Sequence, residues 1–188
     1  MNVHRKLSAF ESAQETAARY GYSANIESAN EFDCAELKNL LHLWQQKCDG
    51  RIMPKRSDFS LRDLKAVASH VALVDIVETD EGKTRYRMRL LGDYLAAVVD
   101  NVTSVYLDEH ADEGYREIQA AIFGELVAKR VPLRYEGPIP QENSSHVHTD
   151  SLILPLSENG ITPTAALVAA WFSAPKYTND IGAERFDR

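Results

Sequence analysis

The chain has 188 residues, of which 44% are hydrophobic and 26% are charged, and its formal net charge is −7 at pH 7. This composition favours one folded domain with flanking tails and excludes a chain that is disordered throughout. The acidic balance argues against nucleic acid as a partner, because a nucleic-acid binder needs a basic face. No apolar run approaches the ~20 residues of a membrane span. Residues 1–30 lack the apolar core of a secretory signal, so we expect a cytoplasmic protein without a membrane partner.

The beginning of the chain is polar and is expected to lie outside the main folded domain. Residues 1–32 are predicted to be a helical or flexible extension. A helix over roughly 4–19 is favoured because residues with high helix propensity dominate that stretch. The first strongly patterned element begins only at Asp33.

The helix that begins at Asp33 carries an apolar stripe at helical spacing. The stripe consists of Leu37, Leu40, Leu41 and Trp44. Asp49-Gly50 is a typical helix end. A sheet that has helices on one face leaves its other face to be covered. We therefore expect this stripe to be a docking face, either for a sheet of the same chain or across a homodimer interface.

Two strands joined by a polar turn at 80–83 are predicted next. The first, 71–78, is apolar on both alternating faces, as in a strand that is covered on both sides. The second, 85–91, alternates apolar and basic residues, which predicts a half-buried strand. Its apolar set is Tyr86, Met88 and Leu90, and its basic set is Arg85, Arg87 and Arg89. We expect Glu78 and Glu81 to neutralise these arginines across the hairpin.

The second half of the chain is predicted to contain a helical middle followed by three strands. A short helical turn over 94–99 precedes the longest helix, 112–130. A strand then runs from Pro132 through Tyr135. Two more strands, 146–156 and 164–172, surround the turn signal Asn159-Gly160, and a polar tail occupies 174–188. This order predicts an α+β fold with antiparallel strands.

The order of elements and several short motifs resemble PAS domains. The motifs are Leu43-Trp44, Met53-Pro54-Lys55-Arg56-Ser57-Asp58, Leu73-Val74-Asp75, Arg85-Tyr86-Arg87, Leu91-Gly92 and Leu154-Pro155-Leu156-Ser157. They are similar to those of the single-domain PAS family of alphaproteobacteria, often described as a domain of unknown function. The resemblance covers about residues 36–173 and implies a five-stranded antiparallel sheet with a helical segment on one face. We expect a PAS-like domain over 33–173, with the leading helix on the other face.

A module of this kind would hold a ligand between its sheet and its long helix. The candidate lining residues are Met88, Tyr94, Phe123, His148 and Trp171. The last predicted strand is rich in small residues, namely Ala165, Ala166, Ala169 and Ala170. On an inner face these alanines would leave room for a ligand. On an outer face they would let a helix approach closely, and both interpretations stay open.

Histidines raise two further possibilities. His146, His148 and Asp150 alternate, so on a regular strand they would point the same way and could bind a divalent metal. A polar strand start is the more ordinary interpretation, and we predict neither a metal site nor a catalytic residue. His110 precedes the long helix, in a region where some haem-binding PAS domains place an axial ligand. A solvated helix-start histidine is favoured, and no cofactor is predicted.

The sequence thus predicts a non-catalytic sensory or regulatory module. Its partner would be a small ligand or a signalling protein, and we expect it to form a homodimer. Any output domain is expected on another protein. Two alternatives remain: a metal-dependent enzyme on a cone-like α+β fold that uses His146, His148 and Asp150, and an interaction scaffold with no ligand.

Overall fold

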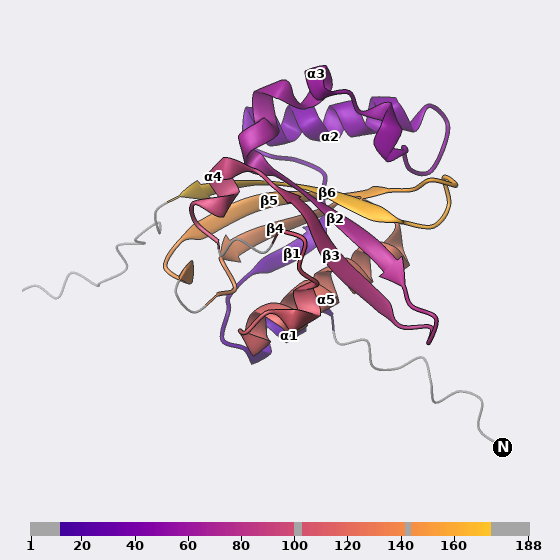
Figure 1. Cartoon of the computed structure of the whole chain (residues 1–188). Coiled ribbons are helices and arrows are strands. Elements are labelled where there is room, and N and C mark those ends of the chain that lie inside the picture. The colour runs from indigo at the N-terminus through magenta and orange to yellow at the C-terminus, as the bar shows by residue number, and fades with distance from the viewer. Residues whose placement is uncertain (1–11, 100–102, 142–143, 174–188) are drawn as a thin grey trace, which may run out of the picture.

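Six antiparallel strands form one sheet, in the order β1-β4-β5-β6-β2-β3 (Figure 1). The computed structural model describes residues 12–99, 103–141 and 144–173. The strands are β1 Asn25–Ser28, β2 Val71–Glu78, β3 Thr84–Leu91, β4 Leu133–Pro138, β5 His148–Leu156 and β6 Ala165–Ser173. The expected α+β fold with an antiparallel sheet is confirmed. The tail 174–188 and the first part of the helix expected over 4–19 lie outside the described residues.

Helices cover both faces of the sheet. They are α1 Ala13–Arg19, α2 Ala35–Cys48, α3 Leu61–Leu64, α4 Asp93–Ala96 and α5 Glu113–Lys129, with 3₁₀ turns η1 Arg56–Asp58, η2 Lys65–His70 and η3 Leu107–Glu109. Figure 1 shows α5 and α1 on one side of the sheet and α2 and α3 on the other. Within the described ranges, no helix is both long and apolar enough to cross a membrane.

Strand β1 was not expected from the sequence. It has only four residues and pairs with β4, where Ile26 lies opposite Tyr135. Ile26 is its one buried side chain. A single buried residue in a polar run gives no alternation that a sequence pattern could reveal. The sheet therefore has one more strand than the five that the resemblance implied.

Helix α2 lies on the sheet through the apolar stripe identified in the sequence. The stripe residues are buried in one cluster with Leu152, Leu154 and Leu156 of β5. The indole Nε1–H of Trp44 donates a hydrogen bond to the carbonyl oxygen of Pro155 at 2.9 Å. The helix ends where Asp49 and Gly50 adopt positive φ angles of 45° and 78°, as expected for a left-handed helix terminus.

A β-bulge in β3 overturns one expected side-chain direction. Leu73 pairs with Leu90, but the next residue, Val74, pairs with Met88. Arg89 is therefore an extra residue in β3, and an extra residue reverses the alternation beyond it. Met88 faces α5 as expected. Leu90 instead lies on the α2 and α3 side of the sheet, beside Leu73.

The basic face of β3 is neutralised, but not by the residues that the sequence suggested. Arg87 and Arg89 both bind the carboxylate of Asp75, at 2.9 and 2.7 Å. Arg85 binds Asp108 and Glu109, each at 2.7 Å. Partial burial would raise the pKa of Asp75, but the hydrogen bonds from Arg89 and Arg87 hold it below its ordinary value. The predicted role of Glu78 and Glu81 is therefore wrong.

The middle of the outer edge of β3, at Met88, is covered by the segment 104–106. The Ser104 N–H donates to the Met88 carbonyl at 2.7 Å, and the Met88 N–H donates to the Val105 carbonyl at 3.0 Å. The guanidinium of Arg85 lies over the ring of Tyr106, 3.7 Å from its centroid. These contacts hold the segment against the strand. The residues Asp100-Asn101, just before this segment, lie outside the described residues.

The start of α3 is fixed by a capping box, which gives a test in solution. The N–H and the hydroxyl of Ser60 each donate to the Asp63 carboxylate at 2.8 Å. These bonds, with help from Lys47, lower the pKa of Asp63 from 3.8 to about 2. Because the folded pKa lies below the unfolded value, this carboxylate stabilises the fold above pH 3.8 and stops doing so as the pH falls through about 2.

We expect an NMR titration of the Asp63 carboxylate to give a midpoint near pH 2. In Ser60→Ala the hydroxyl bond is lost and the backbone bond is kept, so the midpoint should rise but remain below 3.8. A midpoint in the unchanged protein at the ordinary value would contradict the cap.

Candidate functional site

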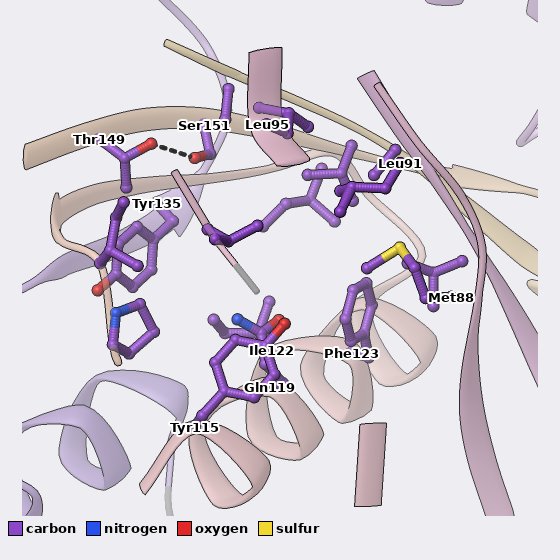
Figure 2. Close-up of a pocket in the computed structure, with 18 of the residues that line it drawn as sticks. Met88, Leu91, Leu95, Tyr115, Gln119, Ile122, Phe123, Tyr135, Thr149 and Ser151 are labelled. Atoms are coloured by element: carbon purple, nitrogen blue, oxygen red, sulfur yellow. Dashed lines mark hydrogen bonds between the residues drawn. The ribbon is translucent and has the colours of Figure 1, made fainter. Parts of the chain in front are cut away.

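A cavity of about 120 Å³ lies between the sheet and α5. Residues from β2, β3, β5, β6 and α5 line it, and it is partly open to solvent. Figure 2 shows Tyr115, Gln119, Ile122 and Phe123 of α5 facing the side chains of the strands. The long helix therefore provides one wall of the cavity and the sheet provides the other.

Alternation along β6 divides its alanines between the two faces of the sheet. Ala170 lines the cavity, and Ala166 belongs to the core on the same side of the sheet. Ala165 and Ala169 lie on the opposite face, in the cluster that contains the α2 stripe. Each of the two interpretations of the alanine-rich strand thus describes one of its faces.

The cavity wall is mostly apolar and carries no charge. No Asp, Glu, Lys, Arg or His is among the described residues that line it. Polar groups come mainly from β5, where the hydroxyls of Thr149 and Ser151 lie 2.9 Å apart and are hydrogen-bonded (Figure 2). One of the two hydroxyls donates to the other, so the second keeps an O–H that a ligand could accept. The Tyr135 hydroxyl donates instead to the Pro138 carbonyl at 2.5 Å.

Helix α5 adds one more polar side chain to the wall. Gln119 lines the cavity from the helix side. Its amide makes no hydrogen bond to any residue in the described part of the chain. An amide offers both donors and an acceptor. The cavity thus has hydrogen-bonding groups on both of its walls.

The structure separates the five candidate ligand residues into two groups. Met88 and Phe123 line the cavity. Tyr94 and Trp171 do not, because they stack on either side of His70 with ring centroids 4.0 and 4.3 Å away. His148 lies on the α2 side of β5, since Thr149 and Ser151 occupy the alternate positions that face the cavity.

The three residues considered as metal ligands are not brought together. His146 lies in an exposed turn before β5, so the expected alternation begins only at His148. Both carboxylate oxygens of Asp150 bind Arg134, at 2.8 and 3.0 Å. The described ranges contain no group of three His, Cys, Asp or Glu that could hold a metal ion.

His110 also lies outside the cavity. Its Nδ1 accepts a hydrogen bond from the Asp112 N–H at 3.1 Å, and its Nε2 lies 3.4 Å from the Gln141 amide nitrogen. Its ring packs against Tyr115. Both ring nitrogens are therefore engaged within the chain.

Several lining residues were missed by the sequence analysis. Thr149 and Ser151 are buried polar residues two positions apart in β5. Residues two positions apart on a strand share one face, so this spacing could have indicated a polar spot on the cavity side of β5. Gln119 gave no comparable signal, because a single polar residue on a helix is ordinary.

A comparison with protein families identifies the fold family of the chain. A family model described as a PAS domain matches residues 33–168, which is more than half of the chain. A search of curated proteins and a search of solved structures found no match.

Proposed function

The chain belongs to the PAS domain family, and from this premise we propose that it is a sensory module that binds a small neutral ligand in the cavity between its sheet and α5. The observation that carries the proposal is the cavity itself. A well-packed interior has few spaces larger than a water molecule. The cavity in this protein measures about 120 Å³ and opens to solvent. Space of this kind beside a few polar groups is typical of a small-molecule site.

The size of the cavity limits the ligand. An apolar protein cavity of roughly 150 Å³ can hold benzene. A ligand of about the size of one aromatic ring therefore fits, with part of it in the opening. We propose a monocyclic or short branched apolar compound.

The lining limits the chemistry of the ligand. An uncharged wall makes a charged ligand unfavourable, because burying an unpaired charge is costly. The Thr149–Ser151 pair and the Gln119 amide favour one polar group, such as a hydroxyl or carbonyl. Nothing in this arrangement calls for a chemical step, and we propose that the module is non-catalytic.

Phenol and benzoate provide a matched test, because they share a ring and differ in charge at neutral pH. We expect phenol to shift the amide resonances of β5, β6 and α5 in NMR spectra, and benzoate to leave them unchanged. Ala170→Leu fills the cavity and should weaken phenol binding by about tenfold or more. The same replacement at Ala120, on the exposed face of α5, should leave it unchanged.

Two results would refute this function. One is the absence of phenol-induced shifts in the unaltered protein. The other is phenol binding that Ala170→Leu leaves intact. The first result would favour a ligand-free scaffold, and the second would show that phenol binds outside this cavity.

Expectations about the location, the signal output and the assembly of the protein belong to the same proposal. We infer a cytoplasmic bacterial module like the single-domain PAS proteins it resembles, and the free thiols of Cys34 and Cys48 are compatible with a reducing compartment. We also infer that its signal reaches a separate signalling protein. A homodimer remains a prediction, and it would need surfaces other than the α2 stripe, which is buried within the chain.

A further inference from the structure

A second hollow lies on the opposite face of the sheet from the cavity. It has a volume of about 250 Å³ and lies between α3, η2 and strands β2 and β3. Phe59, Leu61, Leu64, Leu73 and Leu90 supply much of its apolar wall, and Arg56 lies at its edge. We call this hollow the α3 groove.

Two leucines of the α3 groove are unusually accessible. The exposed fraction of Leu61 is 92%, and that of Leu90 is 46%. A single exposed leucine needs no explanation. Two of them line the same apolar hollow, and exposed apolar surface gathered in one place marks interaction sites.

Leu61 is held in place and is not at the tip of a loose loop. It is the first residue of α3, directly after Ser60 of the capping box. Asp63 of the same turn binds the Lys47 ammonium of α2 at 3.1 Å. These contacts fix the backbone that carries Leu61, so that part of the chain loses little conformational freedom when a partner binds.

The surroundings of the groove are basic, although the whole chain is acidic. Arg56, Arg62 and Lys65 are exposed and make no ion pair with other described residues. Two acidic residues of the same segment are already paired, Asp58 with Arg51 at 2.7 Å and Asp63 with Lys47. Positive charge therefore remains around an apolar hollow on a chain of net charge −7.

We propose that the α3 groove binds an acidic amphipathic helix of a partner protein. Apolar side chains of that helix would enter the groove against Leu61 and Leu90, and its carboxylates would meet Arg56, Arg62 and Lys65. Recognition of one apolar helix face by a groove is a common mode of peptide binding. The proposal names the partner surface for the signal output proposed above, and in that sense it rests on the proposed function.

The shape of the surface favours a peptide over a membrane. The hollow is concave, so an apolar side chain of a peptide can enter it, whereas a flat bilayer surface cannot follow it. We therefore expect micromolar affinity that falls as salt is added, because the charges at the rim are exposed.

The direct test uses two helical peptides that carry leucines at i, i+3, i+4 and i+7. One has glutamate on its polar face and the other has lysine. Fluorescence anisotropy should show binding of the glutamate peptide only. Leu61→Ser should weaken this binding by about tenfold or more. Ile161→Ser, at a leucine-sized side chain that is 56% exposed elsewhere, should not change it.

Charge reversal gives a second and independent test of the proposed contacts. The triple variant Arg56→Glu, Arg62→Glu and Lys65→Glu should lose the glutamate peptide and gain the lysine peptide. These residues are exposed, so the variant should remain folded, as circular dichroism would verify. A triple variant whose affinity for each peptide equals that of the unaltered protein would overturn the proposal.

Three further outcomes would also overturn it. They are failure of the glutamate peptide to bind, Leu61-dependent binding to phosphatidylglycerol vesicles in its place, and Leu61-dependent self-association seen by light scattering. The Ala170→Leu variant separates this proposal from the ligand site. It should lose phenol binding and keep peptide binding, so the failure of one proposal is distinguishable from the failure of the other.

Discussion

Replacing Trp44 with alanine is expected to lower the free energy of unfolding by about 3–5 kcal/mol. The side chain is 6% exposed and joins α2 to the sheet. Its removal leaves a space among the leucines of β5, and it leaves the buried Pro155 carbonyl without the indole donor. Urea unfolding followed by far-UV circular dichroism measures the loss without relying on tryptophan fluorescence.

Two variants calibrate this expectation. Trp44→Phe keeps most of the apolar contact and loses the hydrogen bond, so it should cost about 1–2 kcal/mol. Ile161→Ala, at an exposed side chain, should cost less than about 0.5 kcal/mol. A Trp44→Ala protein as stable as the Ile161→Ala protein would show that α2 contributes little to holding the sheet.

Gly92→Ala is expected to be comparably damaging, by about 3 kcal/mol. Gly92 ends β3, and its N–H donates to the Val71 carbonyl at 2.9 Å. A Cβ at this position would lie 2.4 Å from the Ser69 carbonyl oxygen and 2.7 Å from that of Ala68. Both are backbone atoms, so no side chain can rotate away. The end of β3 would have to separate from η2.

Gly82→Ala is the matched control for Gly92→Ala. Gly82 has a φ of +75° and nothing within 4 Å of its Cβ position, so the substitution tests the backbone conformation alone and should cost about 1 kcal/mol. At Gly92 the φ is −67°, which alanine adopts without strain. The whole loss of stability therefore comes from the contact of the new Cβ with the backbone of η2. Equal losses in the two variants would argue against the close approach.

Strong periodic signals made the main elements predictable from sequence. The apolar faces of α2 and α5 repeat over several turns, and their inner residues Leu37, Trp44, Ile118 and Ile122 are buried. Pairing within the sheet was less accessible. The bulge at Arg89 is a property of two strands in register, and one strand viewed alone cannot reveal it. Leu90 was therefore assigned to the wrong face.

The location of the cavity was the least predictable feature. Strand β5 is buried on both faces from Ser151 to Leu156, so its apolar residues do not indicate which face borders the open space. The leucines Leu152 and Leu154 face α2. His148 was predicted to line the cavity, but it shares their face and lies away from the cavity, whereas its neighbour Thr149 lines it. Only the position of α5 decides between the two faces.

The covered edge of β3 has a consequence for assembly. Unpaired edge strands invite another molecule to continue the sheet, which leads to fibres and aggregates. Here the segment 104–106 already occupies the backbone groups of Met88, and at the opposite end β1 offers only four residues. Concentrated solutions of the folded protein should therefore be less prone to strand-by-strand polymerisation along β3.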